Sequence, residues 1–445
     1  MPFPFRIPPL LSVGVSLSAL AAVLPSPVVQ AQQGEADVRV LLAEGPVLSL
    51  AAVERTLVLR PEGPSAAGIE LSPGSPLELR LVQGRLQARG REGTTALPAA
   101  ASIWLDLKPA QTAADGGVFR LQERRYRGRL QLRLIDGRIQ AINHIGVEHY
   151  LPSVVASEMP ARWPQAALRA QAVAARTYAL RQRKPAAAFD LTATVSSQVY
   201  KGVEAETDST RQAVASTRGQ VLMYGDQLAN TVFHSSSGGR TENSGDLWSQ
   251  QLPYLVSVPD YDQNSPVHQW EQPLAPDLLR KAFGEIGGVQ RIDIVASTAT
   301  GRVRQARVIG PAGTLVVTGP QLRSRLGLRS TQVRFEVLEP RPAAGLPPLT
   351  PPPVVPEPLV DSATGMPMAS GQRGGTAPGA SGRWTPRTGS RPTAQPLIVA
   401  IGRGYGHGVG MSQWGALALA ERGEDHERIL SHYFRGTQLR RYPTP

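Results

Sequence analysis

The fold is decided by the stretch VEHYLPSVVASEMPARWPQAALRAQAVAARTYALRQR, which occupies residues 147–183. Its first part places apolar residues at helical spacing and ends at Pro160, which cannot continue a helix and disfavours helical geometry at the residue before it. Its second part starts at Pro164, a favourable first-turn residue, and repeats apolar side chains on one face to about Arg183. We therefore expect two helices here, with Glu158 at the end of the first.

Strand-like sequence surrounds these two helices. Residues 32 to about 145 alternate apolar and polar side chains, and Leu130, Leu132 and Leu134 lead into Asp136-Gly137 with the pattern of a β-hairpin. Shorter strand-like pieces recur between residues 195 and 338. This mixture predicts an α+β protein with a β-rich N-terminal scaffold and a mixed helix and sheet domain.

Composition excludes several classes of protein. The 445 residues are 41% hydrophobic, enough for a packed core, and no cysteine is present. A disulfide scaffold, an iron–sulfur cluster, a thiol nucleophile and a cysteine-ligated zinc site are therefore excluded. The net charge of 47 − 35 = +12 suggests polyanionic surroundings, although a basic composition without a dedicated anion site is the open alternative. Aromatic residues, at 5%, are too few for extensive base stacking.

The first 31 residues predict the compartment. Arg6 precedes an apolar run from Leu10 to Leu24, and small residues at Val29 and Ala31 suit a signal-peptide cleavage site. An uncleaved anchor is the alternative, but the run is short for a membrane span. We expect an exported chain, in the periplasm or cell wall, that meets a membrane only through this segment. Export argues against nucleic acid as its partner.

Two later segments are unusual. Residues 341–396 are rich in Pro, Gly, Ser and Thr without an apolar period, which predicts a disordered linker. The run GRGYGHGVGMSQWGA at 402–416 then alternates glycines around His407 before a predicted helix, but it is neither of the common nucleotide-binding loops. We expect its glycines to let the backbone approach something large, with His407 and Gln413 exposed. A structural loop with a hydrogen-bonded histidine is the alternative.

Glu158 is the best candidate for an acid. Its apolar neighbours predict partial desolvation, which would raise the pKa of the carboxyl group, as a general acid for glycosidic cleavage requires. The alternative is a helix-end glutamate paired with Arg162 or Arg176.

A second polar segment, FHSSSGGRTE, spans residues 233–242. A serine hydrolase is not indicated, because Gly-x-Ser-x-Gly is absent. His234 and His407 lack the further ligands and the spacing of a zinc site. We therefore expect neither a metal nor a cofactor.

Taken together, several motifs resemble the SpoIID/LytB family. They are YLPSVVASEMP at 150–160, ALRAQAVAARTYA at 167–179, QVYKG at 198–202, FHSSSGG at 233–239, PYL at 253–255, the glycine run at 402–416, and the residues from Ile429 to Thr437. The family includes a sporulation lytic transglycosylase, which cuts peptidoglycan strands stripped of stem peptides, and an amidase enhancer. The resemblance implies peptidoglycan glycan strands as the partner, and a cell-wall amidase under the alternative of a non-catalytic enhancer.

The resemblance also implies the site. Glu158 would be the catalytic acid, donating to the oxygen between N-acetylmuramic acid and N-acetylglucosamine. As a carboxylate it would then take the proton of the C6 hydroxyl, so that one group serves both steps and a 1,6-anhydro ring closes. A second carboxylate would not be needed. The residues that we expect to line the glycan groove are Tyr178, His234, Ser236, Tyr405, His407, Ser412 and Gln413.

Finally, the resemblance implies a division of the chain. A signal peptide at 1–31 and a β-rich region at 32–124 precede a SpoIID-type domain, whose parts at 125–340 and 397–445 are separated by the linker at 341–396. The linker would then be an insertion, and the two parts would fold together. Some relatives carry a Cys/His zinc site, which this cysteine-free chain cannot form.

Overall fold

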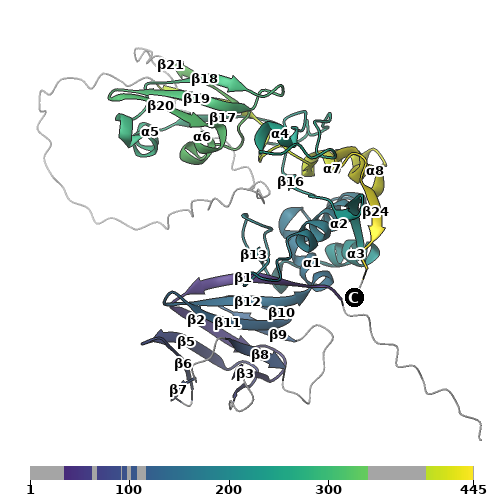
Figure 1. Cartoon of the computed structure of the whole chain (residues 1–445). Helices are drawn as coiled ribbons and strands as arrows, with labels where there is room; N and C mark the ends of the chain where they lie inside the picture. The colour runs from purple at the N-terminus through teal and green to yellow at the C-terminus, as the bar shows by residue number, and fades with distance from the viewer. Residues whose placement is uncertain are drawn as a thin grey trace, which may run out of the picture. The chain divides into compact units, whose positions relative to one another are not determined.

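A computed structural model describes residues 35–62, 68–91, 93–97, 102–107, 117–338 and 397–443 (Figure 1). The predicted signal peptide at 1–31 and the predicted linker at 341–396 lie outside the described residues. Helices and strands alternate along the described chain, and the strands dominate before residue 147. The α+β class and the sheet-rich N-terminal part predicted from the sequence are confirmed.

The N-terminal strands form two sheets with one shared apolar core. The first has the order β13-β1-β12-β11-β8-β3-β4 and the second the order β10-β9-β2-β5-β6-β7. The first sheet consists of β1 (Asp37–Gly45), β3 (Leu57–Pro61), β4 (Ile69–Leu71), β8 (Ile103–Leu107), β11 (Arg129–Ile135), β12 (Arg138–Gly146) and β13 (Leu191–Thr192). The second consists of β2 (Val47–Ala52), β5 (Pro76–Val82), β6 (Arg85–Gly90), β7 (Gly93–Ala96), β9 (Val118–Leu121) and β10 (Arg124–Arg127).

The predicted hairpin is present between β11 and β12. These strands pair antiparallel, with Ile135 opposite Arg138. The two turn residues, Asp136 and Gly137, both have positive φ angles, 49° and 73°, as a two-residue hairpin turn of this hand requires. β1 also pairs with β12, so strands on both sides of the boundary expected at residue 124 share one sheet. The domain boundaries themselves stay predictions.

The two predicted helices are also present. α1 (Val147–Glu158) ends where Met159 turns to an extended conformation before Pro160, and α2 (Gln165–Arg181) follows. Alanines recur along α2, and their small side chains allow close packing against α1, α3 (Asp208–Ser216), α7 (Gln413–Glu421) and α8 (His426–Tyr433). Within the described residues, no helix is long and apolar enough to cross a membrane.

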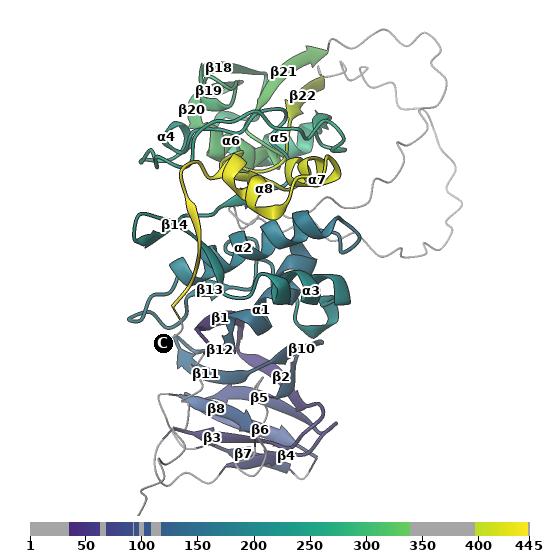
Figure 2. The ribbon, with the colours of Figure 1, turned by 90° about the vertical axis from the view of Figure 1, so that its right-hand side faces the viewer.

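A second apolar core lies further along the chain. It is built on two three-stranded sheets, β17-β22-β21 and β18-β19-β20, with α5 (Pro276–Ala282) and α6 (Gly319–Leu326) (Figure 2). The strands are β17 (Gln269–Leu274), β18 (Arg291–Ser297), β19 (Val303–Gly310), β20 (Gly313–Thr318), β21 (Val333–Leu338) and β22 (Leu397–Arg403). Short elements complete the described chain: η1 (Val203–Ala205), α4 (Ser244–Leu247) and η2 (Gly284–Ile286).

The C-terminal segment is joined to earlier sequence at three places. β22 lies between β17 and β21, β23 (Met411–Ser412) pairs with β16 (Phe233–His234), and β24 (Gln438–Arg441) pairs with β14 (Gln220–Tyr224). β15 (Gln227–Leu228) completes the last of these sheets. Residues 397–443 therefore fold as part of the same body as residues 220–338.

Candidate active site

Glu158 is the last residue of α1, and its side chain is fully buried. Its Oε1 accepts a hydrogen bond from the backbone N–H of Val199 at 3.1 Å, and its Oε2 accepts one from the side-chain amide of Gln413 at 3.3 Å. Both donors are uncharged. The carboxyl group also stands at the negative end of the helix dipole, which does not stabilise an anion. Gln413 opens α7, so this contact joins two segments that are 255 residues apart.

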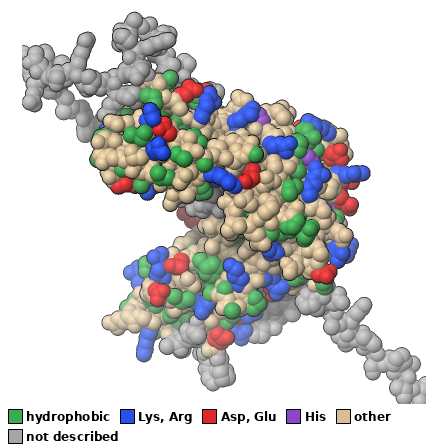
Figure 3. All heavy atoms as spheres, turned by 45° about the horizontal axis from the view of Figure 1, so that its top comes forward, with side chains coloured by type: hydrophobic (Ala, Val, Ile, Leu, Met, Phe, Trp, Pro, Cys, Tyr) green, Lys and Arg blue, Asp and Glu red, His purple; other side chains and the backbone are tan. Residues whose placement is uncertain are grey.

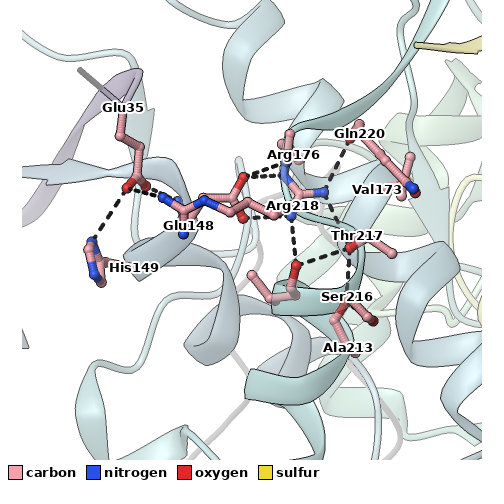
Figure 4. A network of polar contacts seen from close by, with 12 residues as sticks. Glu35, Glu148, His149, Val173, Arg176, Ala213, Ser216, Thr217, Arg218 and Gln220 are labelled. Carbon is pink, nitrogen blue, oxygen red and sulfur yellow. Dashed lines mark hydrogen bonds and ion pairs between the residues drawn. The ribbon is translucent and has the colours of Figure 1, made fainter. Parts of the chain in front are cut away.

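One of the two arginines considered as a partner of Glu158 is bound to another carboxylate. Arg176 is fully buried and binds Glu148 through two hydrogen bonds of 2.8 and 2.7 Å (Figure 4). The same guanidinium donates to the backbone carbonyl groups of Val214 and Gln220, and Arg162 is exposed to solvent. The Glu148–Arg176 pair therefore has a structural role, and Glu158 is not needed to balance it.

The alternating glycines at 404, 406, 408 and 410 pack against the chain itself. All four have positive φ angles, and a Cβ atom on any of them would overlap with Ser236 and Ser237, His234, Arg302 or Val232, in that order. The expectation that this backbone leaves His407 and Gln413 exposed is wrong, because His407 is 8% exposed and Gln413 is fully buried. The loop packs closely onto residues 232–237, where His407 donates to the carbonyl of Phe233, and Gln413 points to the buried Glu158.

The two histidines of the predicted site lie together. The rings of His234 and His407 have centroids 5.2 Å apart. His407 Nδ1 accepts from the N–H of Val409, so its Nε2 is the donor to the carbonyl of Phe233 at 3.0 Å. His234 Nδ1 donates to the carbonyl of Val409 at 3.1 Å, and its Nε2 faces the hydroxyl of Ser237 at 2.8 Å. These bonds select one tautomer for each neutral ring.

The structure brings most of the other predicted residues beside these histidines. Ser412 pairs with His234 in the short β16–β23 ladder and caps α7 by accepting from the N–H of Gly415. Ser236 and Tyr405 exchange two backbone hydrogen bonds of 3.1 and 2.8 Å. These four residues therefore form one continuous strip with Gln413, the contact of Glu158.

Tyr178 lies on α2, half-buried, and burial raises the pKa of its hydroxyl. Tyr150, on α1, lies near both Tyr178 and Glu158. Burial raises the pKa of Tyr150 well above its usual value, and the nearby Tyr200, Glu158 and Tyr178 raise it further. The role of Tyr178 in lining the site stays a prediction.

Sequence reasoning missed a buried pair of acids at Asp260 and Asp262. Asp262 accepts from the hydroxyl of Ser236 and from the N–H of Gly238, and it contacts His268 at 3.0 Å. Asp260 accepts from the hydroxyl of Tyr433 at 2.6 Å.

The surroundings of Asp260 favour its neutral form. Burial, and then the neighbouring charge of Asp262, raise the pKa of Asp260 to about 6, although hydrogen bonds from Tyr433, Ser412 and Ser237 lower it. The hydroxyl groups that donate to this pair belong to Ser236 and Tyr433, which lie in other segments, so the sequence around the pair does not signal its burial.

Several buried polar atoms near the predicted residues have no hydrogen-bond partner among the described residues. One is the side-chain oxygen of Gln413, whose amide nitrogen contacts Glu158. Others belong to Ser157 and Ser235, which adjoin Glu158 and His234, and to both amide atoms of Gln171 on α2. Because buried polar groups are nearly always satisfied, such a concentration suits a place where a polar ligand binds. In the part of the chain that the structure describes, no three side chains of His, Asp or Glu converge as metal ligands would.

A buried acid, beside a histidine-bearing loop that is held by glycines, defines a candidate acid–base site. Comparison with known proteins agrees with the motifs: residues 135–224 match the sequence model of SpoIID, described as a stage II sporulation protein. The chain is 28% identical over 323 residues to stage II sporulation protein D of Bacillus subtilis, covering 67% of this chain and 76% of that protein. Its Bacillus amyloliquefaciens counterpart is 29% identical over 322 residues, with 67% and 75% covered.

An amidase enhancer of Bacillus subtilis is 30% identical over 314 residues, which are 66% of this chain and 40% of the enhancer. The chain therefore contains a region that matches the SpoIID family model, and its similarity to these relatives extends over about two thirds of its length. The matches to the two sporulation proteins and to the enhancer cover similar shares of this chain, so they do not distinguish a lytic from an enhancing role.

Proposed function

We propose that this chain is an exported peptidoglycan lytic transglycosylase that cleaves the bond between N-acetylmuramic acid and N-acetylglucosamine in peptide-stripped glycan. The observation that supports it is the enclosure of Glu158 at a helix end, in contact with Gln413 from the histidine-bearing segment. Removal from water disfavours the ionised form of a carboxyl group, although N–H donors to its two oxygens act in the opposite direction. Such a group can keep a proton until a substrate oxygen reaches it.

In the proposed reaction Glu158 donates its proton to the glycosidic oxygen, and the bond from that oxygen to C1 of the muramic acid breaks. The sugar passes through an oxocarbenium-like state. The Glu158 carboxylate then takes the proton of the C6 hydroxyl while the C6 oxygen bonds to C1. The products are a free N-acetylglucosamine end and a 1,6-anhydro muramic end, and Glu158 is protonated again. No water is consumed, so a single carboxyl group suffices.

Substrate must reach a side chain that is closed off. We propose that the glycosidic oxygen replaces the amide of Gln413 on Oε2, because this 3.3 Å hydrogen bond is the longer of the two described. The unpartnered oxygen of Gln413 would then accept from a sugar hydroxyl or acetamido N–H. Tyr178, His234, Ser236, Tyr405, His407 and Ser412 are proposed to line the glycan path, with the histidines acting as neutral hydrogen-bond partners.

A non-catalytic role is the second candidate: a peptidoglycan-binding protein that modifies or enhances a cell-wall amidase. Two observations favour it. Glu158 has no exposed surface, and an amidase enhancer is as similar to this chain as the sporulation proteins are. Either function places the protein at the cell wall.

The test is digestion of purified glycan strands without stem peptides, with mass analysis of the released sugars. Wild type should release 1,6-anhydro products, which are lighter by one water than hydrolysis products. Glu158→Gln should release none while it keeps its melting temperature. Glu54→Gln, at an exposed position, is the matched control and should behave as wild type. Equal release by wild type and Glu158→Gln, or none by either, refutes the enzyme. A purified amidase that works faster with the chain present would then support the enhancer.

A further inference from the structure

A groove of about 680 Å³ lies on the sheet formed by β17, β22 and β21. Its volume falls within the roughly 300–1,000 Å³ of ordinary ligand sites. Its lining includes Gln269, Glu271, Ile401, Arg403 and Arg334, with the backbone at Gly301 beside them. None of these residues belongs to the acid–base site described above.

The register of the sheet explains which side chains face the groove. Gln269 is directly opposite Arg403, and Ile401 lies between Glu271 and Arg334. The alternate residues, Trp270, Gly402 and Val333, form the row between them, and Trp270 and Val333 pack into the second apolar core. Because side chains of a strand alternate between its two faces, the groove occupies the outer face of this sheet.

Arg403 is the distinctive group of this groove. It is exposed, and among the described residues its guanidinium group has no hydrogen-bond or ion-pair partner, whereas Arg334 pairs with Glu336 at 2.9 Å. Lys and Arg side chains are otherwise scattered over the face drawn in Figure 3. A free guanidinium group in a groove presents a planar fork of donors that fits a carboxylate.

Amide groups flank this cation. Gln269, on the neighbouring strand, has its Cβ about 5 Å from that of a directly opposite residue such as Arg403. The side-chain oxygen of Gln332 is buried without a partner among the described residues, while its nitrogen donates to the carbonyl of Thr300 at 2.7 Å. The guanidinium group of Arg403 can donate to a carboxylate, and the side-chain oxygen of Gln332 can accept a hydrogen bond. This combination suits a sugar acid that also carries N–H or hydroxyl groups.

The strand β22, which lines the groove, leads directly into the histidine-bearing loop. Arg403 ends β22, and the next residue, Gly404, is held by the indole N–H of Trp270 at 2.8 Å and by the carbonyl of His268 at 3.2 Å. Tyr405 then pairs with Ser236. Tyr405, which belongs to the proposed glycan path, is only two residues beyond Arg403. A linear polymer that lies along β22 would therefore reach that path.

We propose that this groove binds a stretch of the same glycan strand beyond the cleavage site, with the free lactyl carboxylate of a peptide-stripped muramic acid on Arg403. The inference rests on the proposed function for the identity of the polymer. It adds a reason for preferring stripped strands, because a stem peptide would convert that carboxylate into an amide and remove the charge that Arg403 recognises.

The test measures binding and not cleavage, in the Glu158→Gln background, by titration with short stripped strands. A second set of strands has its carboxylates converted to amides. Arg403→Leu should weaken binding of the unmodified strands about tenfold or more, the range of a charge-assisted bidentate contact. The amidated strands should bind weakly to both proteins. Arg307→Leu removes an exposed arginine outside the groove and is the matched control.

Arg403→Lys keeps the charge without the planar fork, so intermediate binding is expected, and melting temperatures report folding for every variant. Unchanged binding of unmodified strands by Arg403→Leu overturns the proposal. An equal loss for unmodified and amidated strands also overturns it, because the carboxylate would then not be what Arg403 recognises. If Glu158→Gln still releases product, the enzymatic function fails, yet a carboxylate-dependent loss at Arg403 would still establish the groove as a glycan site.

Discussion

Asp260 makes the stability of this protein depend on pH in a direction opposite to that of most carboxylates. Its pKa is raised from 3.8 to about 6, first by burial and then by the charge of Asp262. A group whose pKa is raised on folding stabilises the folded state while it is protonated. That contribution is complete below pH 3.8 and is lost as the pH rises through 6. With about 1.4 kcal/mol for each tenfold change in proton affinity, ionised Asp260 costs on the order of 3 kcal/mol of folding free energy.

Asp260→Asn isolates this effect. An asparagine oxygen can still accept from the Tyr433 hydroxyl and the Tyr261 N–H, and the amide nitrogen can donate to the nearby serine hydroxyls. Steric match matters here, because a Cβ on Gly415 would already overlap with Asp260 and Tyr433. We expect the variant to be more stable than wild type at pH 8, and its advantage to shrink by up to about 3 kcal/mol as the pH falls to 3.5.

The measurement is urea unfolding of both proteins at closely spaced pH values, with the difference in unfolding free energy plotted against pH. Taking the difference cancels the titration of carboxylates that do not interact with Asp260. A difference that stays constant between pH 3.5 and 8 would refute the reasoning. A difference that grows as the pH falls would show that Asp260 is held as a carboxylate in the folded protein.

Two further predictions concern the buried ion pair of Glu148 with Arg176 and the segment between β21 and β22. Glu148→Gln leaves Arg176 buried without its counter-charge, so we expect a loss of about 3–5 kcal/mol in urea unfolding, against about 1 kcal/mol or less for Glu204→Gln in the exposed pair with Arg125. Losses of equal size would contradict the structural role of Arg176. Second, Leu338 and Leu397 are directly opposite at the ends of β21 and β22, so Asn-Gly can replace the 396 − 339 + 1 = 58 residues between them. We expect a folded protein, more stable by on the order of 3 kcal/mol; loss of the native circular dichroism spectrum would show that those residues are required.

The sequence predicts features that depend on neighbouring residues. Helices α1 and α2 follow from apolar spacing and two prolines, and the β11–β12 hairpin follows from alternation around Asp136-Gly137. Each of these signals acts within about a dozen residues, where the period of the side chains and the allowed φ angles decide the outcome. The α+β class could therefore be predicted from the sequence.

The candidate site depends on contacts that no local pattern encodes. Two arginines were considered as partners of Glu158, and only the folded position of Glu148 shows that Arg176 is bound elsewhere. The pKa of Asp260 is raised mainly by burial, and this burial is a product of the fold, in which the Tyr433 hydroxyl reaches Asp260 from 173 positions away. The exposure of His407 was predicted wrongly because glycines allow close approach without specifying what approaches.

The glycine run explains why Glu158 and the histidines belong to one unit. Gly404, Gly406 and Gly410 have no Cβ atoms where the loop meets residues 232–237, and this close approach aligns β23 with β16. The short ladder in turn sets the start of α7, where Gln413 reaches Glu158. A single Cβ at position 406 would push against His234 and displace the ladder and helix together. The loop therefore acts as the connection through which the C-terminal segment positions the amide on the proposed catalytic acid.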